Sequence, residues 1–316
     1  MAENKNLTTK EAFAKEVSKA ITDALGNVSV ATTEFQKLNE KYLSLVVKPE
    51  DGNVGMNANV DSLYEKYLQG VSFEKLCAHI IALLKDAMAN MPTDEAIDMI
   101  TNYEEAKKHL VVEVVSAEAN KDLLETIPHK DIEDMAVVYR IDTEPCLANG
   151  SVLVTNHMLE TYDVTLEELH KDALKYAPVN KPLQIRTLAE VLGVEADLLG
   201  VGTTEDFLLV ASVPGDIHGA GVLAYEEFMD KAAERIGGSF YLLPSSIHEL
   251  LIVADRVEKT MDLTMLEEMV RQINETTVDP TEKLTDSVYH YDAKDKIFEL
   301  GTKYIIRHAE KKEDIA

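Results

Sequence analysis

The segment Gly237–Arg256 reads GGSFYLLPSSIHELLIVADR, with two apolar runs on either side of Pro244-Ser245-Ser246. Proline fixes φ and serine hydroxyls bond nearby backbone amides, so this tripeptide is typical of a tight turn. We therefore predict two antiparallel strands, SFYLL and IHELLIVA, joined by the turn. The same segment brings two serines, a histidine and a glutamate close together in sequence, which raises the alternative of a hydrolase nucleophile and its base.

Strand geometry favours the turn over the hydrolase. Side chains alternate along a strand, so His248 would face away from Glu249. A nucleophile elbow needs Gly-x-Ser-x-Gly between a strand and a helix, whereas these serines follow Pro244 between two strands. His248, with Ser245 or Ser246, nevertheless stays a candidate catalytic residue, because a polar ring in an apolar strand must find a partner or line a cavity.

Strands and single helices alternate on both sides of this segment. Upstream we predict strands DFLLVASV and GAGVLAY, a turn at 214–216 and the helix EEFMDKAAERI; downstream follow the helix LTMLEEMVRQIN and the hairpin DSVYHYDAKDKIFEL. Earlier strands are Leu110 to Val115, DMAVVYRID and GSVLVTN, and Thr165 and Glu168 form a capping box at a helix start. The pattern predicts an α+β domain over residues 108–300, with a mainly antiparallel sheet and helices on one side.

The N-terminal third has a different pattern. A capping box from Thr8 to Glu11 precedes apolar residues at four-residue spacing and a stop at Gly26, which predicts an amphipathic helix. Two strands around Asn39-Glu40-Lys41 and two further helices follow. We expect residues 1–107 to form a mostly helical lobe with one β-hairpin, preceding a boundary near His109, and residues 301–316 to form a tail.

Composition limits the classes of function. The chain has 316 residues, 46% of them hydrophobic, and its 57 acidic against 31 basic residues give a net charge of −26. This charge argues against direct nucleic-acid binding and against an anionic membrane surface, and it fits a protein partner with a basic surface. Two cysteines, no signal peptide and no apolar run of membrane-spanning length indicate a cytoplasmic protein.

Other candidate residues occur as partial motifs. His129 precedes a strand with Asp134 nearby and could form an acid–base pair, although an ordinary strand start explains both residues. Glu167 and His170 have the spacing of a di-iron motif but lack the second copy, so we predict no metal and no cofactor. Candidate binding residues follow a predicted helix and are either a packed sheet face or a partner site: Asn274, Asp286, Tyr289 and Tyr291.

Five blocks of the sequence resemble, in order, an uncharacterised family that is common in clostridial gut anaerobes. The blocks are SLYEKYLQGVSFEKL, LLETIPHKDIEDMAVVYRI, SVLVTNHMLETYDVTLEELHKDAL, FYLLPSSIHELLIV and MVRQINETTVDPTEKLTDSVYHYD. The resemblance covers nearly the whole chain and implies a cytosolic bacterial protein. It supplies no catalytic residue and no cofactor.

Two hypotheses of different classes follow. The first is a non-enzymatic, acidic protein that acts by macromolecular binding, in regulation or in conflict between hosts and mobile elements. The second is a hydrolase that uses His248 with Ser245 or Ser246, or the pair His129 and Asp134. Convergence of these side chains in one pocket would distinguish the second from the first.

Overall fold

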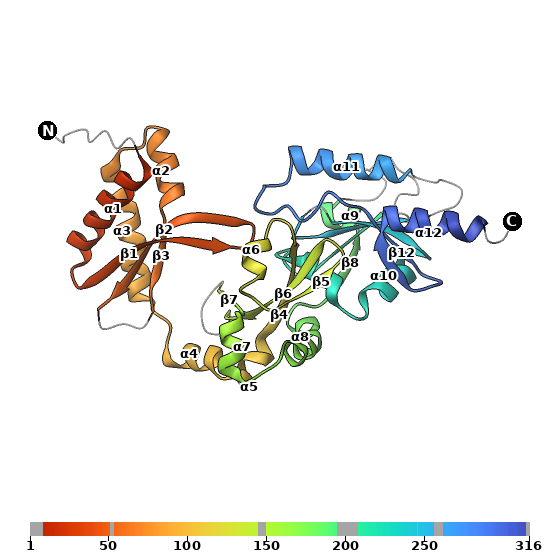
Figure 1. Ribbon diagram of the computed structural model, residues 1–316, viewed down its shortest axis with the longest axis horizontal. Helices are drawn as coiled ribbons and strands as arrows, with labels where there is room; N and C mark the ends of the chain where they lie inside the picture. Colours follow the sequence, from red (N-terminus) through yellow and green to blue (C-terminus); the bar gives the residue numbers. More distant parts are fainter. Residues whose placement is uncertain are drawn as a thin grey trace. The chain divides into compact units, whose positions relative to one another are not determined.

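The computed structural model describes residues 9–50, 54–144, 150–194, 208–244, 246–255 and 262–313 (Figure 1). The chain divides into two compact units, Met1–Thr93 and Asp94–Ala316, so the division falls earlier than the expected boundary near His109. Helices α4 (Asp94–Thr101) and α5 (Tyr103–Ala106) belong to the second unit, because side chains of both are buried in its core.

The first unit is a three-stranded antiparallel sheet packed against helices. Its elements in chain order are α1 (Lys10–Leu25), β1 (Val28–Lys37), β2 (Glu40–Pro49), β3 (Met56–Asn59), α2 (Val60–Leu68) and α3 (Phe73–Ala89). The predicted helix is present, although its N-cap is Thr9 rather than Thr8, and it ends at Gly26 with φ 77°. The sequence predicts only a hairpin here, because the tetrapeptide that forms β3 has no clear apolar alternation.

The second unit contains two antiparallel sheets (Figure 1). Its strands are β4 (Leu110–Ser116), β5 (His129–Ile132), β6 (Met135–Asp142), β7 (Ser151–Leu153), β8 (Gln184–Thr187), β9 (Leu208–Ser212), β10 (Phe240–Leu243), β11 (Leu250–Ala254), β12 (Tyr289–Asp292) and β13 (Ile297–Leu300). Its remaining helices are η1 (Lys107–His109), α6 (Lys121–Leu124), α7 (Asn156–Tyr162), α8 (Leu166–Asn180), α9 (Leu188–Leu192), η4 (Gly219–Ala224), α10 (Phe228–Ile236), α11 (Leu263–Thr276) and α12 (Gly301–Glu313).

In the four-stranded sheet, β6 pairs with β4 along one edge and with β5 and β7 along the other. The six-stranded sheet has the order β13-β12-β10-β11-β9-β8. The α+β class and the antiparallel pairing are therefore confirmed. In the four-stranded sheet, β4 and most of β6 are buried along their length, as their near-continuous apolar sequences predict.

Helices lie on both faces of the six-stranded sheet, not on one side as expected. Phe240 and Leu242 of β10 belong to a core that includes α10, whereas Tyr241 and Leu243 belong to a core that includes α11. Side chains of a strand alternate between faces, so a strand that is apolar at every position needs cover on both. The uninterrupted apolar sequence of β10 is thus explained by this packing.

Three further predictions differ from the structure. The GAGVLAY segment is not a strand but the 3₁₀ helix η4. Its glycines allow close packing, since a Cβ on Gly219 would overlap the Ser212 side chain and the His248 carbonyl oxygen. Residues 301–313 are not a tail but helix α12, whose Arg307 pairs with Asp292 and Glu299. The third difference concerns β11, which begins only at Leu250 and so excludes His248 and Glu249.

None of the helices that the structure describes is long and apolar enough to cross a membrane.

Candidate functional site

The segment between β10 and β11 is held in place by backbone contacts on both sides. The Ile247 amide donates to the Glu282 carbonyl oxygen at 2.9 Å, and the Ala220 amide donates to the Ile247 carbonyl oxygen at 3.1 Å. Ser246 is buried, and its Oγ accepts a hydrogen bond from the His248 amide at 3.0 Å. Ser246 therefore has the hydrogen bond of a turn serine. Ser245 lies outside the described residues.

The His248 imidazole contacts a neighbouring loop instead of a serine hydroxyl. Its Nδ1 accepts a hydrogen bond from the His218 amide at 3.2 Å, so the ring proton lies on Nε2, which is 3.3 Å from Glu282 Oε1. In the described part of the chain, no hydrogen bond joins this imidazole to Ser246. The geometry gives the Ser246 and His248 pair no nucleophile–base contact, and it makes His248 a support for His218.

His218 ends a loop with unusual backbone geometry. Gly215, Asp216 and His218 have φ of 83°, 54° and 56°. Non-glycine residues rarely adopt positive φ, and they do so where the surroundings stabilise it. Asp216 forms an ion pair with Arg186, and the His218 amide bonds His248, so both ends of the strained stretch are anchored. The loop positions the His218 ring toward β4.

Glu113 is the residue of β4 that His218 approaches. It interrupts an apolar strand, is 4% exposed, and has its Oε1 3.6 Å from His218 Nδ1 and 3.4 Å from Arg140 Nε. Arg140 Nε itself donates to Ser151 Oγ at 2.9 Å. Glu113 Oε2 is buried and has no hydrogen-bond partner among the described residues. A buried carboxylate oxygen without a donor is uncommon and requires an explanation.

Glu113 and His218 line a cavity of about 490 Å³ within the second unit, which we call the Glu113 cavity. Its polar described lining includes Glu113, Asp142, Glu144, Ser151, Asn180, Lys181, His218 and Tyr225. Gly221 of η4 forms part of the wall, and a Cβ there would overlap the Val112 carbonyl oxygen. Glycine is thus required where η4 crosses β4 next to the cavity.

Burial sets the ionisation of the histidine in this cavity. It lowers the pKa of His218 below its ordinary value, and the nearby Glu113 carboxylate opposes that shift only in part. The neutral imidazole is therefore favoured near pH 7 and can either donate or accept a proton. Outside the cavity, burial raises the pKa of Glu249, an effect that the adjacent His248 reduces.

The second predicted pair is not assembled. His129 begins β5, its Nδ1 lies 3.1 Å from the Ile127 carbonyl oxygen, and its Nε2 lies 3.8 Å from Asp131. Asp134 occupies the turn between β5 and β6 and accepts hydrogen bonds from Thr285, Ser287 and Tyr289. No ion pair or hydrogen bond joins His129 to Asp134, both of which are described.

Three of the four predicted binding residues, Asn274, Tyr289 and Tyr291, are buried, and Asp286 is half-buried. Tyr289 and Tyr291 share one face of β12, as their alternation predicts, and both are buried in the core. Asn274 is buried and its Nδ2 donates to the Thr285 carbonyl oxygen at 2.9 Å and to Asp286 Oδ1 at 2.7 Å. These contacts connect α11 to the segment before β12.

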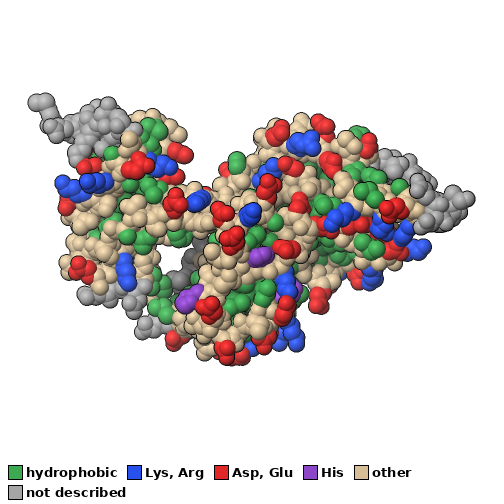
Figure 2. All heavy atoms as spheres, in the orientation of Figure 1, with side chains coloured by type: hydrophobic (Ala, Val, Ile, Leu, Met, Phe, Trp, Pro, Cys, Tyr) green, Lys and Arg blue, Asp and Glu red, His purple; other side chains and the backbone are tan. Residues whose placement is uncertain are grey.

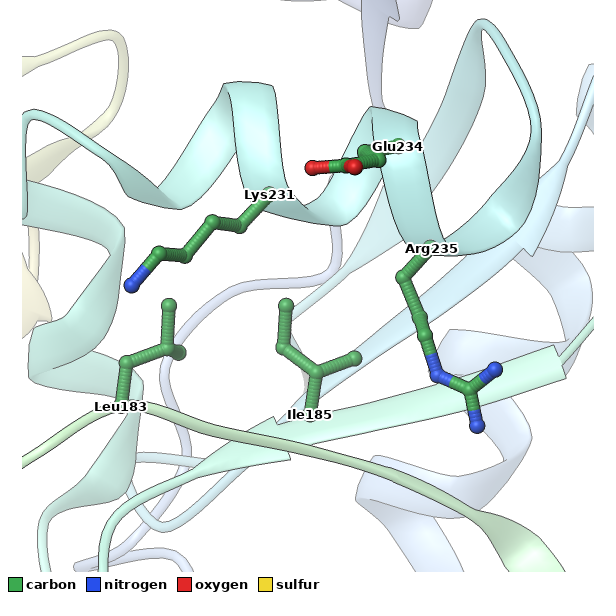
Figure 3. A pocket seen from close by; sticks show the side chains of 5 residues that line it. All are labelled: Leu183, Ile185, Lys231, Glu234 and Arg235. Atoms are coloured by element: carbon green, nitrogen blue, oxygen red, sulfur yellow. The ribbon is translucent and has the colours of Figure 1, made fainter.

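A second cavity, of about 420 Å³, lies between α10 and β8. Figure 3 shows Lys231 and Arg235 extending from α10 toward Leu183 and Ile185, with Glu234 beside them. Lys231 is already paired with Glu227 at 2.7 Å, and no buried polar atom of these five lining residues is unpaired. Unlike the Glu113 cavity, this cavity therefore has no unpaired buried polar atom among its described lining residues.

Sequence reasoning missed Glu113, Arg140 and His218. The signal for Glu113 was present, since one glutamate stands in an otherwise apolar strand, LVVEVVS. His218 had a weaker signal, the cluster GDIHGAG, in which glycines and an aspartate indicate left-handed backbone. Within the described residues, no group of three or more His, Cys, Asp or Glu side chains is placed to hold a metal ion.

Comparison with known proteins identifies a family whose function is unknown. A family model described as a family of unknown function (DUF5688) matches residues 10–293. No curated protein and no solved structure matches the chain. The matched range covers most of both units and every described lining residue of the Glu113 cavity. Because the match spans nearly the whole sequence, the chain belongs to this family of unknown function.

Proposed function

We propose that this protein binds a small polar ligand in the Glu113 cavity. The observation that carries the proposal is the Glu113 carboxylate, which is buried at the cavity wall with Oε2 unpaired in the described structure. Ligand sites are concave, enclose about 300–1,000 Å³ and contain a few placed polar groups. The Glu113 cavity matches this description in size and in lining.

The macromolecular-binding hypothesis has less support from the described surface. Its candidate contact residues Tyr289 and Tyr291 lie on β12 and are buried in the core. On the face that Figure 2 displays, acidic side chains are interspersed with lysine and arginine and form no single acidic patch. A partner with a basic surface and a cytoplasmic location are thus proposals that rest on composition, whereas the small ligand rests on a defined cavity.

A second candidate function is acid–base catalysis on the bound ligand. It is favoured by the 3.6 Å separation of His218 Nδ1 and Glu113 Oε1 at the cavity wall. A neutral imidazole next to a carboxylate is a pair that can transfer a proton. This pair replaces the Ser246 and His248 pair as the residues on which a hydrolase hypothesis would rest.

The test is a screen of small polar metabolites by amide chemical shifts. We expect at least one compound to shift the amides of His218 and Gly221, with weaker binding to Glu113→Gln and unchanged binding to Glu118→Gln. Glu118 is an exposed glutamate of the same unit, so it controls for net charge. A screen in which every hit leaves these two amides unshifted would refute the proposal. Conversion of a hit by the wild type, with loss in His218→Gln, would establish the catalytic candidate.

A further inference from the structure

We propose that His248 is a pH-sensitive latch for the loop of residues 214–218, and that protonation of its imidazole releases this loop. Residues of the loop form part of the wall of the Glu113 cavity: Pro214, Gly215, Ile217 and His218. Acidification would therefore change the access of solvent to the cavity. The inference concerns the conformation of the loop and does not depend on ligand binding.

The contact that holds the loop requires an unprotonated nitrogen on His248. The His218 amide donates to Nδ1 at 3.2 Å, so Nδ1 carries a lone pair and the ring proton lies on Nε2. An imidazolium has an N–H donor at each nitrogen and no acceptor. Turning the ring over does not restore the contact, because a carbon then takes the place of Nδ1. Only a neutral His248 can accept a hydrogen bond from the His218 amide.

The loop is strained next to this contact. Asp216 and His218 have φ of 54° and 56°, values that residues other than glycine adopt rarely and where the surroundings stabilise them. Ile217 between them is 63% exposed, so little side-chain packing holds the middle of the loop. Among the described residues, His248 Nδ1 is the acceptor of the His218 amide. Loss of that hydrogen bond removes the contact that stabilises the backbone at His218.

Contacts on both flanks limit the movement to the middle of the loop. Asp216 is paired with Arg186, and the Ala220 amide of η4 donates to the Ile247 carbonyl oxygen at 3.1 Å. Neither contact uses the imidazole, so both persist when the ring takes up a proton. We therefore expect the middle of the loop to change conformation while η4 and the strands keep theirs.

Groups around the ring favour its protonation as pH falls. The His248 side chain is 24% exposed, so water reaches it, and Glu282 Oε1 lies 3.3 Å from Nε2. Glu249 adds a second acidic side chain close to the ring. The opposing group is the His218 ring, with its centroid 5.6 Å away, but burial lowers the pKa of His218 and so disfavours its positive charge. Imidazole is the side chain that ordinarily changes charge between pH 8 and 5, which sets the range of the latch.

An NMR titration of the ¹⁵N-labelled full chain between pH 8 and 5, at constant ionic strength, tests the latch. Imidazole ¹⁵N shifts report which nitrogen of His248 carries the proton, and amide shifts report the conformation of the loop. We expect an unprotonated Nδ1 at pH 8, and a His218 amide that shifts with the same midpoint as the His248 ring. Across that midpoint, the hydrogen-exchange protection factor of the His218 amide should fall at least tenfold relative to that of Ile252 in β11.

Two variants separate the His248 ring from other titrating groups. His248→Gln supplies a side-chain carbonyl oxygen that accepts at every pH, so we expect the His218 amide to lose its titration. His218→Gln keeps the backbone amide and removes the neighbouring ring, so the transition should persist.

Several results would overturn the latch. One is a proton on His248 Nδ1 at pH 8, and another is a His218 amide that does not follow the midpoint of the His248 ring. An equal transition in His248→Gln, or its loss in His218→Gln, would assign the change to another group. If His248→Gln fails to fold, the wild-type titration and His218→Gln still decide. The metabolite screen tests the proposed function separately.

Discussion

Asp134 joins the two sheets of the second unit, and its removal gives the sharpest prediction on stability. The carboxylate lies in the turn between β5 and β6, and its Oδ2 accepts hydrogen bonds from Thr285 Oγ1 and Ser287 Oγ, each at 2.8 Å. Its Oδ1 accepts the hydroxyl of Tyr289, a fully buried residue of β12. Asp134→Ala removes all three acceptor contacts at once.

The size of the destabilisation depends on whether each hydroxyl finds another acceptor once the Asp134 carboxylate is removed. Thr285 and Ser287 precede β12, and short hydroxyls there can rotate toward other acceptors, so their loss is partly compensated. Tyr289 cannot do so, because its ring is fixed in the core, and burying a hydroxyl without a partner costs about 1–3 kcal/mol. A lost hydrogen bond to a charged group adds roughly 1.5–3 kcal/mol. We expect Asp134→Ala to lower the free energy of unfolding by about 3 kcal/mol.

Urea denaturation followed by far-UV circular dichroism measures this change, with hydrogen exchange of the β12 amides to assign the transition to the second unit. With a urea slope of about 1–3 kcal/mol per molar, the midpoint should fall by roughly 1 M or more. Asp131→Ala is the matched control, since Asp131 is an exposed aspartate of the same hairpin, and its effect should stay within about 0.5 kcal/mol. Tyr289→Phe should reduce the cost of Asp134→Ala, because the stranded hydroxyl is then absent. Equal midpoints for Asp134→Ala and Asp131→Ala would refute the reasoning.

Gly221→Ala should lower the free energy of unfolding by about 1–3 kcal/mol, because its Cβ would overlap the Val112 carbonyl oxygen; an unchanged thermal midpoint would contradict this. Thr165→Ala should cost about 1 kcal/mol by removing the capping box with Glu168, and a urea midpoint equal to wild type would exclude that role. Because the pKa of His218 is lowered in the fold, the unfolded chain takes up a proton first as pH falls below about 6.5. Stability should therefore decrease from that pH down through the folded pKa, and His218→Gln should reduce the decrease in urea midpoints between pH 8 and 5.

Sequence patterns predicted elements whose structure depends on local chemistry. The capping box of Thr165 and Glu168 is present, because both of its hydrogen bonds form within one turn. The strands around Pro244 pair antiparallel, as expected for two apolar runs joined by a tight turn. By contrast, η4 was predicted as a strand, because an apolar run with small residues fits either state until its packing partner is known.

The candidate site could not be assembled from the sequence, since it depends on distant pairings. Glu113 and Arg140 meet because Val111 pairs with Arg140 in the register of β4 and β6. His218 reaches them only through a loop whose positive φ values and contact with His248 have no spacing signature. The sequence makes His248 a catalytic candidate, because a polar ring in an apolar segment needs a partner. That partner is the backbone amide of His218, which donates to His248 Nδ1, and the contact holds the His218 loop in place.

Several locally unfavourable features of the fold meet at the Glu113 cavity. Its wall combines a non-glycine residue at positive φ, His218, with a glycine that no other residue can replace without overlap and a buried carboxylate with an unpaired oxygen. Each feature lowers stability, and an apolar residue at position 113 would remove the last of them without altering the strand pattern. Unfavourable local choices of this kind cluster where a site needs a fixed geometry. Three such features meet at the Glu113 cavity, and their meeting in one place is the physical reason to seek the ligand there first.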